Sequence, residues 1–301
     1  MKVDSHMARS TVRWSFCFVG LIMFSGAVGA QTSPAVSPQA TPTPSLEKKF
    51  FINILRDQKA IWTSPFHVDR NDAKWVVPIG LSTAVLFATD RHTSGELVEN
   101  GDNQNRLRIS KDISQLGTVY ATGGVAAAFY LTGRATHDDR ARETGLLSAE
   151  ALLDSGIVAG ALKLVSQRQR PSVDNSSGEF FDGGSSFPSG HAISAWSVAT
   201  VIAQEYGHNR PLVRIGVYGV ATAVSLSRYT GRNHFLSDAL AGSAMGYGIG
   251  RYVYHQHHDP SLDSFTKKKT TSLIPARFFP RIVPLYSPRA RVFGAELAWS
   301  F

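Results

Sequence analysis

SSFPSGHAISAWSVATVIAQEY, which occupies Ser185–Tyr206, joins a loop of small residues to an apolar run that is long enough for a helix. A proline precedes Ser189, Gly190 and His191, and we predict a helix over 190–206. Proline and serine commonly start helices and glycine permits the turn, so one explanation is an ordinary helix start. The other is an anion site, because free N–H groups and the helix dipole attract negative charge at a helix N-terminus.

Five further apolar segments, rich in Ala, Gly, Val and Leu, are predicted to be helical: Trp75–Thr89, Leu116–Gly133, Gly145–Val165, Pro211–Leu226 and Leu236–Tyr254. Most are shorter than the ~20 apolar residues of a membrane span, or contain charged residues. Small residues allow close helix packing in water and in lipid. We therefore expect an all-α fold, a compact helical bundle. A bundle in water is the preferred interpretation, and a bundle embedded in a membrane is the alternative.

The N-terminal 44 residues have a different composition. Residues 1–30 place Lys2, Arg9 and Arg13 before an apolar run that ends in small residues, which predicts a signal peptide cleaved after Ala30 and hence export. An uncleaved membrane anchor is the alternative. Residues 31–44 are rich in Pro, Ser and Thr and are predicted to be a flexible tether.

The predicted helical domain covers residues 45–258. It is expected to begin with a short amphipathic helix capped by Ser45, whose apolar side chains Phe50, Phe51, Ile54 and Leu55 pack on the domain rather than dock on a membrane. Residues 259–301 form a basic, proline-containing tail. Alternating apolar residues over 293–301 predict a strand or hairpin at its end.

The formal net charge is +8, and +6 remains without residues 1–30. A positive balance suits anionic partners such as phosphate esters or lipid headgroups, with possible association with a membrane surface. No basic stripe alternates with aromatic residues, so nucleic acid is not an expected partner. Cys17 is the only cysteine and lies in the predicted signal peptide, so the mature chain would have neither a disulfide nor a cysteine-ligated metal.

Two basic residues suggest an anion site near the end of the third apolar segment. Lys163 and Arg170 are seven residues apart, so a continuous helix would place them on nearly the same face, and Pro171 would end that helix. Two such cations are more often a solvated surface. Lys163, however, lies in a strongly apolar stretch, where an isolated charge is costly without an anion.

A histidine and an aspartate mark the start of the last apolar segment. His234 and Asp238 are four residues apart, so a helix would set the carboxylate beneath the imidazole, with Arg228 ending the segment before. A carboxylate on one ring nitrogen fixes the tautomer and leaves the other nitrogen free to attack or to accept a proton. Taken alone, this pair is more often a surface pair. His255, His257 and His258 follow the segment and are expected to be solvated rather than to bind a metal.

The three motifs indicate a function only when they are considered together. In chain order they are K-x6-R-P, then P-S-G-H, then S-R-x5-H-x3-D, formed by Lys163, Arg170, Pro171, residues 188–191, Ser227, Arg228, His234 and Asp238. This order and spacing resemble the signature of the type 2 phosphatidic acid phosphatase superfamily, which also includes bacterial class A acid phosphatases and vanadium haloperoxidases. The resemblance covers about residues 145–254, with the motifs over 163–238, and implies a helical bundle of that type.

The resemblance also implies a role for each motif residue. Lys163, Arg170 and Arg228 would hold the phosphate oxygens, with Ser189 and the backbone N–H of Gly190 adding hydrogen bonds. His234 would be the nucleophile that forms a phosphohistidine, and Asp238 would orient it. His191 would protonate the leaving group and later activate water. With this much fixed positive charge, no metal and no other cofactor is expected.

The resemblance therefore implies an exported, periplasmic or envelope-associated phosphatase for phosphate monoesters. Phe187 before the proline is more similar to the lipid-phosphatase branch than to the acid phosphatases, which favours lipid phosphates such as phosphatidic acid. Three alternatives stay open: a non-specific periplasmic acid phosphatase, a vanadium-dependent haloperoxidase, and a non-catalytic phospholipid-binding envelope protein.

Overall fold

The computed structural model describes residues 46–99, 103–173, 178–263, 281–287 and 292–298 of the 301-residue chain. The predicted signal peptide, the tether, the Ser45 cap and Cys17 lie outside these residues. The described helices are α1 (Leu46–Thr63), α2 (Arg70–Glu99), α3 (Gln104–Ser114), α4 (Val119–Thr136), α5 (Asp139–Ser166), α6 (Gly190–Tyr206), α7 (Pro211–Thr230) and α8 (Leu236–His257). Short 3-10 turns cover Ser64–Phe66, Gln115–Gly117 and Pro260–Asp263.

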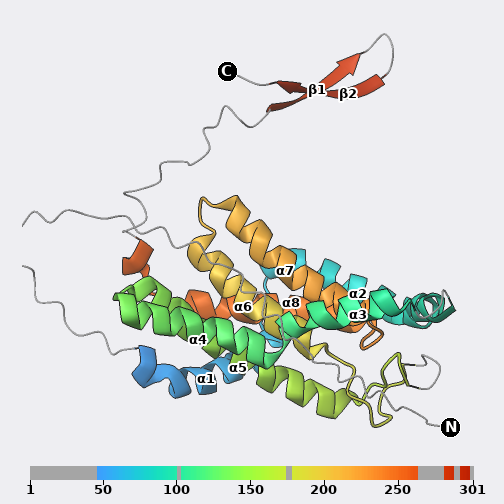
Figure 1. Ribbon diagram of the computed structural model, residues 1–301, viewed down its shortest axis with the longest axis horizontal. Coiled ribbons are helices and arrows are strands. Elements are labelled where there is room, and N and C mark those ends of the chain that lie inside the picture. The colour runs from blue at the N-terminus through green and yellow to red at the C-terminus, as the bar shows by residue number, and fades with distance from the viewer. Residues whose placement is uncertain (1–45, 100–102, 174–177, 264–280, 288–291, 299–301) are drawn as a thin grey trace, which may run out of the picture. The chain divides into compact units, whose positions relative to one another are not determined.

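The helices form one bundle around α6, which packs on α5, α7 and α8, while α4 covers α5 (Figure 1). Its core consists of aliphatic side chains from α5, α6 and α8, among them Leu147, Ile193, Val201 and Val253, which are fully buried. All six apolar segments of the sequence are helical, which confirms the expected all-α bundle. Apolar runs of this length bury most surface when helices pack side by side.

Glycines bring α8 against α6. Gly242, Gly246 and Gly250 are four residues apart and so lie on one face of α8. A Cβ atom at any of the three would overlap a backbone carbonyl oxygen of α6. The absence of side chains on this face therefore permits the close approach of the two helices, and it holds the first residues of α8 near the start of α6.

Two features of the helical part differ from the expectation. Helix α3 was not expected because its sequence is mostly polar and contains no apolar run. It starts where the Asn103 side chain accepts hydrogen bonds from the backbone N–H groups of Asn105 and Arg106 at 3.1 and 3.3 Å. Helix α1 packs on α5 through Ile54 and the polar Asn53 and Asp57, which are buried.

The expected packing of the apolar face of α1 is therefore correct for Ile54 and wrong for two of its neighbours. Phe51 is 76% exposed and Leu55 is 74% exposed. The physical reason is that α1 faces carboxylates of α5 and a histidine of α8, so its polar side is the one that is buried. Its large apolar side chains are left in contact with the surroundings.

The chain also contains a two-stranded antiparallel sheet, β1 (Arg281–Ser287) and β2 (Val292–Ala298), with Arg281 opposite Ala298 and Ser287 opposite Val292. This agrees with the predicted C-terminal strand or hairpin. In the described part of the chain, α5 is the helix that is long and apolar enough to cross a membrane, and more than half of its most apolar window is buried by the other helices.

Candidate active site

The motif residues come together where three helix ends meet: the end of α5, the start of α6, and the turn from α7 into α8. Lys163, in the last turn of α5, donates from Nζ to the backbone carbonyl oxygens of Ser185 and Pro188, at 2.6 and 2.7 Å. Both acceptors belong to the loop that leads into α6. Lys163 therefore fixes this loop across the end of α5 and places its charge beside the helix start.

Arg170 does not lie on α5, so the prediction that it shares a helical face with Lys163 is wrong. The helix ends at Ser166 because Gln167 has a left-handed backbone, with φ 44°, and its N–H closes the last turn onto the Lys163 carbonyl. Arg170 follows in the loop and donates from Nη2 to the Ser185 hydroxyl at 3.2 Å. The loop, rather than helical periodicity, brings the two cations to the same place.

Helix α6 begins at Gly190, as predicted, and Ser189 is its N-cap residue. The Ser189 side chain does not cap the helix, and its Oγ is buried without a hydrogen-bond partner. Its backbone N–H donates to the Asp238 carbonyl at 3.1 Å, which ties the start of α6 to α8. An uncapped helix start beside a free buried hydroxyl agrees with an anion site better than with an ordinary cap, because the first N–H groups have no partner within the helix.

His234 is 2% exposed and precedes α8, which starts at Leu236. Its Nδ1 lies 2.7 Å from the backbone carbonyl oxygen of Ser186, so the assigned tautomer carries its proton on Nδ1. The Asp238 carboxylate is 3.8 Å from the same nitrogen, beyond hydrogen-bond distance. The predicted placement of this carboxylate beneath the ring is therefore wrong in detail, since His234 is outside the helix and a carbonyl takes the ring proton.

Asp238 instead organises the residues around the imidazole. Its carboxylate accepts hydrogen bonds from the Ser186 hydroxyl at 2.5 Å, from the Phe235 backbone at 3.0 Å and from Arg168 at 2.6 Å. Burial raises its pKa, but His234, Arg168 and Ser186 together outweigh burial and hold the pKa of Asp238 below its usual value. Asp238 is thus an ionised anchor for the residues that position His234.

Arg168 is the residue that the sequence motifs did not single out. It is 2% exposed, and besides Asp238 it donates to Asp90 of α2 at 2.8 Å, to the Ser237 hydroxyl at 2.8 Å and to the Gly178 carbonyl at 3.2 Å. It lies inside the K-x6-R-P motif, two residues before Arg170, where spacing alone does not separate a structural arginine from one that holds phosphate. Its buried carboxylate partners identify it as structural.

The surroundings keep both site histidines neutral at pH 7. Burial, together with the charges of Lys163 and Arg228, lowers the pKa of His234 to about 4 despite the opposing effect of Asp238. Burial and then Arg228, with smaller effects from neighbouring groups, lower the pKa of His191 to about 4. A neutral imidazole with Nδ1–H bonded to a carbonyl leaves Nε2 of His234 as the basic, nucleophilic nitrogen.

The surroundings also disfavour the positive charges of Lys163 and Arg228. Burial and the charge of Arg170 lower the pKa of Lys163 to about 8, and the same two causes lower the pKa of Arg228 to about 10. The Nε atom of Arg228 is buried without a hydrogen-bond partner. A group of cations that disfavour one another, with unused donors, fits a dianion such as phosphate.

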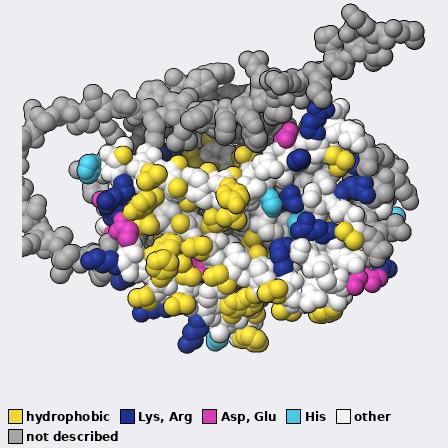
Figure 2. Space-filling model, turned by 60° about the horizontal axis from the view of Figure 1, so that its bottom comes forward, with side chains coloured by type: hydrophobic (Ala, Val, Ile, Leu, Met, Phe, Trp, Pro, Cys, Tyr) yellow, Lys and Arg dark blue, Asp and Glu magenta, His cyan; other side chains and the backbone are white. Residues whose placement is uncertain are grey.

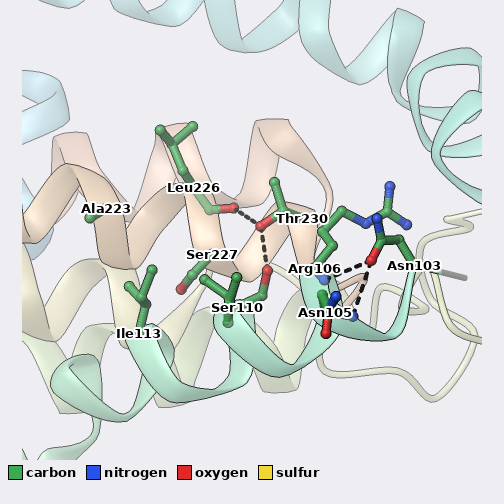
Figure 3. Close-up of a pocket in the computed structure, with 10 residues that line it drawn as sticks. Asn103, Asn105, Arg106, Ser110, Ile113, Ala223, Leu226, Ser227 and Thr230 are labelled. Carbon is green, nitrogen blue, oxygen red and sulfur yellow. Dashed lines mark hydrogen bonds between the residues drawn. The ribbon is translucent and has the colours of Figure 1, made fainter.

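A groove of about 540 Å³ lies near this site but does not contain it. It runs between α3 and α7, with a hydrogen bond of 2.7 Å between Ser110 and Thr230 across it (Figure 3). Its lining is mostly apolar and includes Ser227, the neighbour of Arg228. The histidines of the motifs are not part of that lining.

The histidines that end α8 are away from the motif residues. His255 is exposed, as expected, whereas His257 and His258 are not solvated and bind carboxylates. His257 lies within α8, with Nε2 2.9 Å from Asp57, and His258 Nδ1 is 3.0 Å from Glu143. Their partners are carboxylates from α1 and α5, which the local sequence around the histidines does not reveal.

Comparison with known proteins agrees with the motifs. Residues 144–261 match the model of the PAP2 superfamily. A lipid A 1-phosphatase of Porphyromonas gingivalis is 38% identical over 69 residues, which are 23% of this chain and 16% of that protein. The crystal structure of a transmembrane PAP2-type phosphatidylglycerolphosphate phosphatase from Bacillus subtilis is 20% identical, with a TM-score of 0.43 over 74% of this chain and 98% of that one. The curated relative is thus matched over about a sixth of its own length.

Proposed function

We propose that the protein is a phosphatase that hydrolyses lipid phosphate monoesters through a phosphohistidine, without a metal. The match of residues 144–261 to the PAP2 superfamily supports the proposal. One observation carries the proposal. His234 is a buried, neutral imidazole whose Nδ1 proton is bonded to the Ser186 carbonyl, so Nε2 is unprotonated beside a group of uncompensated cations. That arrangement suits attack on phosphorus and has little use in a purely structural histidine.

Binding of the phosphate group would use the three cations together with the donors at the start of α6. Arg170 and Arg228 would each offer a guanidinium fork, and Lys163 a point charge. The Ser189 hydroxyl and the N–H of Gly190 would complete the contacts at the start of α6. These donors stand ready before substrate arrives, so they also stabilise the charge of the pentacoordinate transition state.

The reaction would proceed in two displacements. His234 Nε2 attacks phosphorus, the bond from phosphorus to the ester oxygen breaks, and His191 gives a proton to the leaving oxygen. Water then attacks the phosphohistidine, His191 takes a proton from it, and the bond from nitrogen to phosphorus breaks to release inorganic phosphate. His191 needs its proton in the first step. The negative charge of the bound phosphate would raise the pKa of His191 again, because it opposes the cations that lower this pKa in the free site.

A lipid substrate is supported by the surface of the protein and by its similarity to the P. gingivalis lipid A 1-phosphatase. Large apolar side chains are exposed on several helices, including Phe51 on α1, Trp75 and Leu81 on α2, and Ile215 on α7. Figure 2 shows hydrophobic side chains gathered in patches on one face, next to Lys and Arg side chains. Apolar patches rimmed by positive charge suit an anionic lipid surface. Export by the predicted signal peptide would place this surface at the cell envelope.

The test is release of inorganic phosphate by the purified protein, with phosphatidic acid in mixed micelles beside p-nitrophenyl phosphate and with a chelator present. His234→Ala should abolish release, whereas His208→Ala, at an exposed histidine after α6, should not. Rapid acid-free quenching with a labelled ester should trap a base-stable phosphoprotein in the wild type only.

The ratio of the two rates separates the lipid enzyme from a general acid phosphatase. Release that persists in His234→Ala would show that another group is the nucleophile. No release from either ester would refute the proposed activity.

A further inference from the structure

A second group of titratable side chains lies at the far end of the bundle from the phosphate site. Asp57 of α1, Glu150 and Asp154 of α5, and His257 at the end of α8 meet there. Glu150 precedes Lys163 by 13 residues on the same helix, which places the two about 20 Å apart along its axis. The proposed phosphatase chemistry makes no use of these residues.

The donor atoms have the spacing of a metal site. One atom each from Asp57, Glu150 and His257 lie within 4.8 Å of one another. His257 Nε2 is 2.9 and 3.1 Å from the two Asp57 oxygens and 3.4 Å from Glu150 Oε1. Ligands about 2.1 Å from a tetrahedral ion are about 3.4 Å from one another, so small side-chain adjustments would bring all three onto one ion.

Two of these oxygens are buried without a hydrogen-bond partner. Asp57 is 1% exposed, Glu150 2% and Asp154 0%. Gln58 donates to one Asp154 oxygen at 2.8 Å, but Oδ2 of Asp154 and Oε1 of Glu150 accept no hydrogen bond. A buried carboxylate oxygen that lacks a partner is costly. Glu150 Oε1 accepts no hydrogen bond and lies 3.4 Å from His257 Nε2, so the group contains an available ligand atom in the right place.

A neighbouring cluster has the same spacing of donor atoms, and Oε1 of Glu205 in it also accepts no hydrogen bond, but its charges are balanced. Glu143 and Glu205 are matched there by two basic groups: His258 Nδ1 is 3.0 and 3.3 Å from the two carboxylates, and Arg140 Nε is 3.3 Å from Glu205. Hydrogen bonds and charge from both glutamates outweigh the burial of His258 and raise its pKa to about 10, so two positive charges face two negative ones.

The cluster of Asp57 is not balanced in this way. In the described part of the chain, the basic group in contact with this cluster is the His257 imidazole, which lies against Asp57 and Glu150. The other polar groups that face it are neutral: Asn53 and Gln58 from α1, and Tyr252 from α8. Such a site takes up protons or a cation.

We propose that Asp57, Glu150 and His257 bind one divalent transition-metal ion, Zn²⁺ or Mn²⁺, with the charge of Asp154 beside it. An imidazole with carboxylate oxygens suits these ions better than Mg²⁺ or Ca²⁺, which prefer oxygen ligands alone. The ion would join α1 to α5 and α8, and so hold the buried polar side of α1 against the bundle. Its role is structural, and it takes no part in the proposed hydrolysis.

The test is metal binding by the full chain, purified in detergent, stripped with a chelator and titrated calorimetrically with Zn²⁺ or Mn²⁺ alone. We expect one ion per chain. Glu150→Gln should weaken binding by at least tenfold, because it removes a ligand charge, whereas Glu205→Gln, the same change in the balanced cluster, should alter it by less than about threefold. Binding that is absent in the wild type, equal in Glu150→Gln, or lost in Glu205→Gln instead would overturn the proposal.

A second measurement guards against misfolding of the variant. In the presence of chelator, Glu150→Gln should melt at or above the wild-type temperature, because a neutral amide replaces an acid that lacks a counter-charge. Added ion should raise the melting temperature of the wild type and of Glu205→Gln, but not of Glu150→Gln. An equal rise in all three proteins would mean that the ion binds elsewhere and would contradict the site.

Discussion

Replacing Arg168 by methionine would leave two buried carboxylates without the cation that joins them. Arg168 is hydrogen-bonded to Asp238 at 2.6 Å and to Asp90 at 2.8 Å, and both carboxylates are at most 1% exposed. Removal of one partner from a buried ion pair costs about 3–5 kcal/mol, chiefly because the remaining charge stays buried and uncompensated. At about 2–4 °C per kcal/mol for a domain of this size, the melting temperature should fall by about 6–20 °C.

The assay is thermal unfolding in detergent, followed by phosphate release well below the melting temperature. Arg168→Met should lower the turnover number even when fully folded, since Asp238 and Ser186 would no longer hold the carbonyl that binds the His234 ring proton. The double variant Arg168→Met, Asp90→Asn should recover part of the stability, because it removes one of the two orphaned charges.

A matched control is available at the surface. Arg91 pairs with Glu179 at 3.1 Å, and both side chains are largely exposed, so Arg91→Met should change stability by less than about 1 kcal/mol. If Arg168→Met unfolds within 2 °C of Arg91→Met and keeps wild-type turnover, Arg168 is not the anchor that the geometry indicates. The argument from its buried partners would then fail.

Three further predictions concern other parts of the molecule. The pKa of Lys163 is about 8, and its charge is present below that value; binding of inorganic phosphate should therefore weaken as pH rises through 8, and Lys163→Arg should remove this limb of the calorimetric pH profile. Gly246→Ala should destabilise the protein by about 1–3 kcal/mol through overlap with α6, whereas Gly248→Ala, where nothing lies within 4 Å, should be neutral or stabilising in the same unfolding assay. The double variant Phe51→Ser, Leu55→Ser should bind anionic vesicles less tightly in a sedimentation assay and keep its rate on p-nitrophenyl phosphate; unchanged vesicle binding would exclude α1 from the lipid contact.

Sequence reasoning reached the helices because long apolar runs bury most surface as packed helices, and it reached the start of α6 because proline, serine and glycine act locally. It missed α3, whose helix depends on the Asn103 cap and on packing against α7 rather than on an apolar pattern. The sequence predicted that Arg170 lies on the same helix as Lys163, because a proline at 171 is expected to end a helix. The chain instead leaves α5 at the left-handed Gln167, four residues before Pro171.

The motif spacing predicted which residues lie close together, but it did not predict their individual contacts. The proton on His234 goes to a backbone carbonyl, and a backbone acceptor carries no signature in the side-chain pattern. The partners of His257 could not be predicted for another reason: Asp57 is 200 residues earlier in the chain, and only the packing of α1 on the bundle brings the two together. Contacts at such separation depend on tertiary structure rather than on spacing.

The proposed phosphate site is assembled from the end of α5, the start of α6, the end of α7 and the start of α8, all within residues 163–238. Helices α1 to α4 contribute to it through Asp90 of α2, which contacts Arg168 and Ser237. Related enzymes could therefore diverge over much of the N-terminal half and still keep the motif residues of 163–238. The exposed apolar surface of α1 and α2, which we propose contacts lipid, would change in that divergence. In such a lineage, an acidic residue at the position of Asp90 would be inherited with the motifs, although it lies more than 70 residues before the first of them.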